Sequence, residues 1–315
     1  MNNVDDHLAS THETTPLQGT FVASLKEKIR SSIGMDSREQ DNNDVNKSNN
    51  KNRLNNNSVV IDALESLLHE KISESQLQSN DHSGITTMYH CKQLESWDCG
   101  IACLLMVNRW LSTQNKEYSS KMVPEDEKLR ETLIGNIGAK SIWTADLVLE
   151  LHKLLGQGSS ADYIFCSKNM GVDESYKDFG YYRDNFARDQ ERVNDAFVEL
   201  QTCSTSCFST SHLPLPLVMN AVSHPNCIAI ALVDNTKLHG FDWSEYLGHY
   251  VIICGCSSDP SHLDLTTNVQ NEDRCLVLKN TGRDDDPTMY VLPSRFERSW
   301  RASGTDDDIV FVIRQ

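Results

Sequence analysis

The chain has 315 residues, 29 of them basic and 45 acidic, which gives a formal net charge of −16 at pH 7. Because nucleic acids and anionic membranes are bound through basic surfaces, this charge argues against both as partners. No apolar run approaches the ~20 residues that span a bilayer, and the polar first residues do not form a secretory signal. We therefore expect a cytoplasmic or nuclear protein, with its ten cysteines present as reduced thiols.

Residues 1–83 differ in composition from the rest of the chain. Residues 41–58 form an Asn-rich polar tract with little apolar surface to bury. Two short amphipathic pieces, at residues 21–29 and 60–68, interrupt this arm, but isolated helices of that length are marginal in water. The composition predicts a disordered acidic arm with transient helices, followed by one folded domain over residues 84–315.

The folded domain begins with helical patterns and continues with strand patterns. Apolar residues at helical spacing predict helices at residues 100–110, 144–156, 189–200 and 215–222. In the second of these, Thr144 followed by Asp146 is the capping signal. Apolar, β-rich runs predict strands at residues 226–233, 249–255, 274–279 and 308–313. Because the helices precede the strands rather than alternating with them, the expected class is α+β.

The most informative segment is residues 93–103, where polar residues lead into a cysteine at the start of a buried helix. Cys99 there faces the positive end of the helix dipole and unpaired backbone N–H groups, which favours the thiolate and lowers the pKa. Its own N–H and the side-chain amide of Gln93 are the candidate oxyanion hole. We expect Asp98 to cap this helix, Cys103 to face the core, and Trp97 to wall a pocket or the core.

A thiolate nucleophile needs a proton shuttle and a group that orients the shuttle. His249 heads a predicted strand that is rigid enough to fix its imidazole. Asn280 ends the next predicted strand, where its amide can accept from the second ring nitrogen. The order Gln93, Cys99, His249, Asn280 predicts a thiol site for acyl transfer or amide hydrolysis, with a peptide, protein or small-molecule substrate and no cofactor.

These motifs resemble two known groups of proteins. Residues 98–103, with Gln93 upstream and Gly248-His249-Tyr250 downstream, resemble papain-like peptidases of the bacteriocin-processing type. The chain is more similar still to the guanylyl cyclase domain-containing family of plants and animals, whose landmarks appear in order at residues 97–100, 141–147, 171–173, 182–183, 192–194, 248–250 and 304–309. The resemblance covers residues 88–315. It implies a papain-like α+β domain with N-terminal helices packed on an antiparallel sheet.

The resemblance leaves two other functions open. The family name implies a cyclase that converts GTP to cyclic GMP with Mg²⁺ or Mn²⁺, although the chain lacks a Gly-rich phosphate loop of the P-loop type. The acidic clusters at residues 284–286 and 306–308 could hold Mg²⁺, but their loop settings favour solvated turns. The other alternative is a non-catalytic interaction module that docks through the acidic arm.

Pairs of cysteines raise the question of a structural zinc site. Cys203 and Cys207 are four residues apart, and Cys254 and Cys256 are two apart on a predicted strand. Structural zinc sites usually draw paired ligands from two turns, whereas Cys254 and Cys256 should share one face of a strand and pack there. We therefore predict no metal site, and we expect Trp143 and Trp300 to belong to the core.

Overall fold

The computed structural model describes residues 46–75, 85–112, 124–156, 159–172, 177, 186–203, 206–210, 212–243, 246–259, 261, 273–283 and 287–315. The chain divides into two compact units, residues 1–63 and 64–315. Helix α2 (Asn46–Ser75) contains the amphipathic piece predicted at residues 60–68 and part of the Asn-rich tract. The piece predicted at residues 21–29 lies outside the described residues, and the disorder of the arm stays a prediction.

One seven-stranded sheet organises the second unit. Its strands, in the order in which they lie in the sheet, are β2 (Cys207–Ser209), β1 (Ala161–Ser167), β7 (Ile309–Arg314), β3 (Cys227–Asp234), β4 (Gly248–Ser257), β5 (Cys275–Asn280) and β6 (Thr288–Val291). Neighbouring strands are antiparallel except β1 and β2, which run parallel. The α+β class is therefore confirmed, but the sheet is mixed rather than purely antiparallel.

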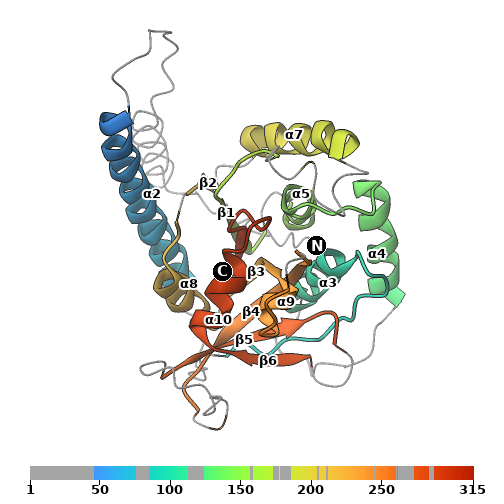
Figure 1. The fold of residues 1–315 in the computed structure, drawn as a ribbon. Coiled ribbons are helices and arrows are strands. Elements are labelled where there is room, and N and C mark those ends of the chain that lie inside the picture. Colours follow the sequence, from blue (N-terminus) through green and yellow to red (C-terminus); the bar gives the residue numbers. More distant parts are fainter. Residues whose placement is uncertain are drawn as a thin grey trace, which may run out of the picture. The chain divides into compact units, whose positions relative to one another are not determined.

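Helices cover both faces of this sheet (Figure 1). One face packs against α3 (Cys99–Ser112), α4 (Pro124–Ile137), α5 (Thr144–Leu155) and α7 (Phe186–Cys203), whose apolar side chains share one core with the sheet. The short helices α8 (Leu215–Val222), α9 (Asn235–Leu238) and α10 (Pro293–Trp300) contact strands β3, β4 and β5. The sheet is thus buried on both sides, which explains its nearly continuous apolar strands.

The four helices and four strands predicted for the domain are all present, with ends that move by up to three residues. The sequence patterns missed α4, α9 and α10 and the strands β1, β2 and β6. Helix α4 begins with Glu125, Asp126 and Glu127 and has few apolar positions, so its periodicity is weak. Strands β2 and β6 span three and four residues, which is too short for an alternating pattern to stand out.

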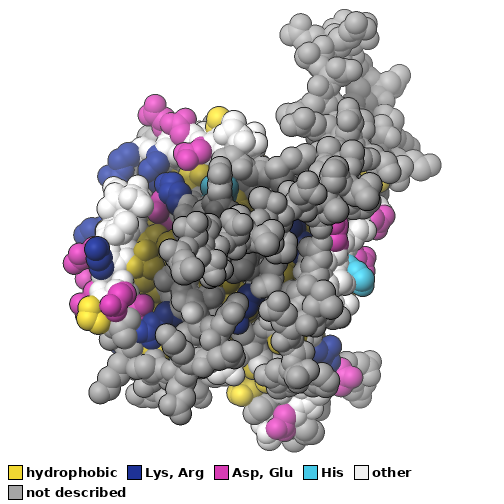
Figure 2. Space-filling model, turned by 180° about the vertical axis from the view of Figure 1, so that it is seen from behind, with side chains coloured by type: hydrophobic (Ala, Val, Ile, Leu, Met, Phe, Trp, Pro, Cys, Tyr) yellow, Lys and Arg dark blue, Asp and Glu magenta, His cyan; other side chains and the backbone are white. Residues whose placement is uncertain are grey.

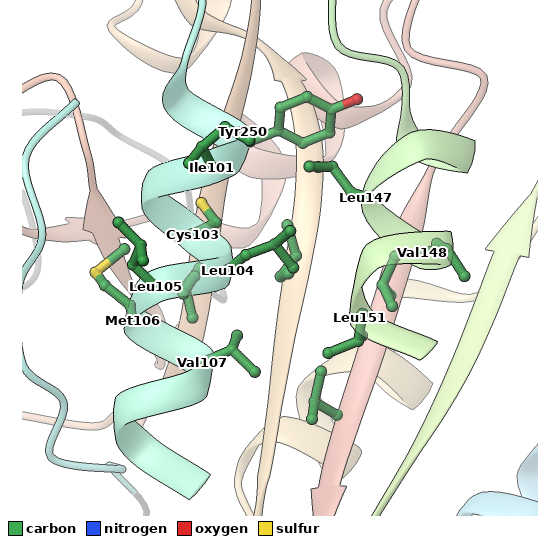
Figure 3. Packing of buried hydrophobic residues seen from close by; sticks show 14 of the residues in the cluster. Ile101, Cys103, Leu104, Leu105, Met106, Val107, Leu147, Val148, Leu151 and Tyr250 are labelled. Atoms are coloured by element: carbon green, nitrogen blue, oxygen red, sulfur yellow. The ribbon is translucent and has the colours of Figure 1, made fainter. Parts of the chain in front are cut away.

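In the core, α3 packs closely against α5 and β4 (Figure 3). A Cβ atom on Gly100 would lie 2.8 Å from a methyl carbon of Leu147 and 3.1 Å from the ring of Tyr250. The lack of a side chain at Gly100 therefore lets the first turn of α3 approach both neighbours. This approach places Cys99, the residue before it, against β4.

The described surface carries both charge signs. On the face drawn in Figure 2, Lys and Arg side chains are interspersed with Asp and Glu side chains. Among the described helices, none is long and apolar enough to span a membrane.

Candidate functional site

Cys99 is the first residue of α3, as the sequence predicts, and it is buried against β4. Its sulfur accepts hydrogen bonds from backbone N–H groups, including that of Tyr250, which follows His249 in the chain. These bonds favour the thiolate, but burial has the larger effect and raises the pKa of Cys99 to about 11. The expected lowering of this pKa is therefore wrong for the structure as it stands, because desolvation outweighs the helix terminus.

His249 and Asn280 meet at the ends of the adjacent strands β4 and β5. The Nε2 atom of His249 lies 2.9 Å from the Oδ1 atom of Asn280, and both side chains are buried. The N–H of Gly282 also donates to Oδ1, at 2.9 Å, which identifies this atom as the acceptor and Nε2 as the donor. The Nδ1 atom of His249 is then the nitrogen left to take up a proton. Burial lowers the pKa of His249, while the Asn280 hydrogen bond opposes that shift.

Gln93 lies beside this pair. A Cβ atom on Gly282 would lie 3.3 Å from Asn280 Oδ1 and 3.6 Å from both Gln93 Oε1 and His249 Cε1, so the three side chains surround one point. Gln93 Nε2 donates to the carbonyl of Glu95 at 2.9 Å. No hydrogen bond joins the Cys99 sulfur to the His249 ring within the described part of the chain. The catalytic roles of all four residues stay predictions.

An ion pair that the sequence does not reveal fixes the loop before Cys99. The buried Asp98 carboxylate pairs with Arg130 of α4 and accepts from the backbone N–H groups of Leu94 and Glu95, at 3.1 and 3.0 Å. The Asp98 carboxylate therefore fixes the preceding loop. It does not cap the N–H groups of α3, so the predicted capping role is wrong. Arg130 also donates to the carbonyl of Lys92 at 3.1 Å, which ties the same loop to α4.

Two adjoining cavities lie beside Cys99. The first has a volume of about 280 Å³ and is lined by segments distant in sequence. They contribute Ser96, Trp97, Cys99, residues 140–144, Leu232, residues 246–248, Tyr250, Gly304, Asp306 and Asp308. The second, of about 760 Å³, shares Ser96, Trp97, Lys140 and Ser141 with the first and adds Arg188. Trp97 and Trp143 both line the first cavity, and the partly buried Trp143 also packs against the core, as predicted. His249, Asn280 and Gln93 do not line either cavity.

The wall of the first cavity contains a buried polar cluster. Thr144 Oγ1 lies 3.0 Å from the hydroxyl of Tyr250, and Asp308 is hydrogen-bonded to the side chains of Thr144 and Ser167. Burial, and then the charge of Asp306, raises the pKa of Asp308 to about 8. The expectation that residues 306–308 form a solvated turn is therefore wrong for Asp308, which is only 7% exposed.

The turn that carries these carboxylates has an unusual backbone. Asp306 and Asp307 have φ angles of 50° and 53°, in the left-handed region that residues other than glycine rarely adopt. Side-chain contacts hold them there: Asn169 Nδ2 donates to Asp306 at 2.7 Å, and Arg301 pairs with Asp307 at 3.0 Å. Asp306 and Asp308, in and next to this turn, line the first cavity.

The cysteine pairs do not form a metal site in the described structure. The register of β4 against β5 shifts between Ile253 and Gly255. Cys254 packs in the core with α3, whereas Cys256 donates to the carbonyl of Met219 in α8, so the expected common face is absent. The side chain of Cys203 lies outside the described residues. No group of three or more His, Cys, Asp or Glu side chains among those described could hold a metal ion.

Comparison with known proteins identifies the family. The model of the family described as guanylylate cyclase matches residues 88–312, which is more than two thirds of the chain. The chain belongs to this family. A curated relative, named guanylyl cyclase 1, from Arabidopsis thaliana, is 29% identical over 252 residues, covering 70% of this chain and 81% of the relative. The matched segment contains every residue that lines the two cavities.

Proposed function

We propose that this protein converts GTP to cyclic GMP and pyrophosphate in the two adjoining cavities. The family match over residues 88–312 carries the proposal, because it spans all of the cavity walls. The name of the Arabidopsis relative supports it. The cysteine, histidine and asparagine motifs by themselves favour a thiol site, whereas the family match favours the cyclase.

The shapes and walls of the cavities suggest how GTP is placed. The cavity of about 280 Å³ has the aromatic walls Trp97 and Trp143, which suit the flat face of a purine. The cavity of about 760 Å³ has Lys140 and Arg188 in its walls, which suit a triphosphate. Lys140 lines both cavities and so belongs at the junction of base and phosphates.

The residues present do not fit a resident metal ion, since the described side chains contain no suitable group of three. Mg²⁺ is commonly held by one or two carboxylates together with the phosphates of a substrate. We therefore propose that Mg²⁺ or Mn²⁺ enters as the metal complex of GTP. In cyclisation, the 3′ oxygen bonds to the α-phosphorus as the bond to the pyrophosphate oxygen breaks. In this proposal, Asp306, which lines the cavity, accepts the proton of the 3′ hydroxyl.

The test is the formation of 3′,5′-cyclic GMP by the purified full-length protein with GTP and either metal, measured by mass spectrometry. Lys140→Ala should lower kcat/KM for GTP at least tenfold, because a cation beside the phosphates is lost. Lys153→Ala is the matched control, since Lys153 pairs with Glu150 on α5 and lies outside both cavities. The cyclase proposal also predicts that Cys99→Ala still forms cyclic GMP, because the thiol takes no part in the cyclisation. Absence of cyclic GMP with both metals would end it.

A second candidate function is thiol-dependent acyl transfer or amide hydrolysis in a papain-like site. The hydrogen bond of 2.9 Å between His249 and Asn280 favours it, because that bond leaves Nδ1 to receive a proton. In this candidate, Cys99 attacks the carbonyl carbon, His249 shuttles the proton and Gln93 supports the oxyanion. A thiol-directed probe should label the wild type but neither Cys99→Ala nor His249→Ala. Cys207→Ala is the control, because Cys207 is a partly exposed thiol. Labelling that survives both substitutions would exclude this candidate.

A further inference from the structure

Asp308 has an acceptor atom that no described residue uses. Its side chain lines the cavity of about 280 Å³, and only 7% of the residue is exposed. The hydroxyls of Thr144 and Ser167 bond to the carboxyl group, yet Oδ1 is buried with no hydrogen-bond partner among the residues described. A buried acceptor without a partner is costly, so a ligand that supplies an N–H donor is favoured at this point.

The surroundings of Asp308 narrow the chemistry of that ligand. Trp97 and Trp143 give the same cavity aromatic walls, which favours a flat ring. The left-handed turn at Asp306 and Asp307 is fixed by Asn169 and Arg301, so the carboxylate next to it is held in place. A flat ring with two adjacent N–H donors on one edge matches a fixed carboxylate beside aromatic walls. Guanine has such an edge, formed by N1–H and the 2-amino group.

We propose that Asp308 is the residue that selects guanine, by accepting hydrogen bonds from N1–H and from the 2-amino group. The proposal deepens the proposed function and rests on it, because it places the base of GTP in this cavity. Binding requires the ionised carboxylate. Because burial raises the pKa of Asp308 to about 8, its carboxyl group carries a proton at neutral pH. That proton passes to the solvent as the two N–H···O bonds form.

Nucleosides test the selection of guanine separately from the cyclase reaction, because they carry no phosphate and cannot be cyclised. Calorimetric titration of the full-length protein should show guanosine binding at least tenfold more tightly than inosine, which lacks the 2-amino group. Adenosine, which lacks the N1–H, should bind more weakly still. Guanosine binding at pH 7 should release close to one proton, seen as a dependence of the measured enthalpy on the ionisation enthalpy of the buffer. This release should decline above pH 8.

Variants and controls make the test specific. Asp308→Asn should weaken guanosine binding at least tenfold and leave adenosine binding unchanged. Asp195→Asn is the matched control, because Asp195 is exposed on α7 and lines neither cavity. If Asp308→Asn does not fold, the proposal is still tested by the wild type, through the ratio of its affinities for guanosine and inosine and through its proton release. Equal binding of guanosine and inosine, or no nucleoside binding, would overturn the proposal. Selective guanosine binding without cyclic GMP formation would instead contradict the proposed cyclase activity and still support the guanine site at Asp308.

Discussion

The ion pair between Asp98 and Arg130 should be among the most stabilising polar contacts of the domain. Both side chains are nearly buried, with 1% and 6% of their surface exposed. Removing one member of a buried pair leaves the other charge without compensation, which typically costs about 3–5 kcal/mol. Asp98→Ala also removes the acceptor for the backbone N–H groups of Leu94 and Glu95. We therefore expect Asp98→Ala to lower the free energy of unfolding by at least as much as Arg130→Met.

A double-mutant cycle measured by urea unfolding checks this expectation. The variant that carries both Asp98→Ala and Arg130→Met leaves no unpaired charge, so its loss should fall short of the sum of the single losses by about 2–3 kcal/mol. Asp242→Ala is the control, because Asp242 and Arg298 form an exposed pair at 3.4 Å, with 79% and 48% of their side chains exposed. That pair should contribute about 0–1 kcal/mol. Single losses below 1 kcal/mol for Asp98 and Arg130, or strict additivity, would refute the reasoning.

Two further predictions concern α3 and its first residue. Because burial raises the pKa of Cys99 to about 11, its alkylation by iodoacetamide, followed by peptide mass mapping, should accelerate about tenfold per pH unit between pH 7 and 9. A rate independent of pH in this range would indicate a preformed thiolate and favour the thiol site. Gly100→Ala should lower the free energy of unfolding by about 1–3 kcal/mol, because the added Cβ would lie 2.8 Å from Leu147. A stabilised Gly100→Ala protein in urea unfolding would show instead that the gain in helix propensity outweighs the overpacking.

Helices and strands whose sequence signals are local can be predicted without the structure. The helix at residues 215–222 was predicted with the bounds that the structure shows, and the helix that starts at Cys99 within two residues at each end. Apolar periodicity requires only neighbours three or four residues apart, so it is complete within the segment. Asn280 was paired with His249 from sequence because each lies at the end of an apolar run, and the structure joins the two side chains.

Properties that depend on residues far apart in sequence become visible only in the folded chain. The sign of the Cys99 pKa shift follows from how deeply α3 packs against β4, which the first turn of a helix does not reveal. The partner of Asp98 is Arg130, on a helix with too few apolar positions to be predicted. The cavity with Asp308 in its wall is built from five segments spread over more than 200 residues. The burial of a side chain and the enclosure of a cavity depend on how the whole chain packs, and a local sequence pattern carries no information about that packing.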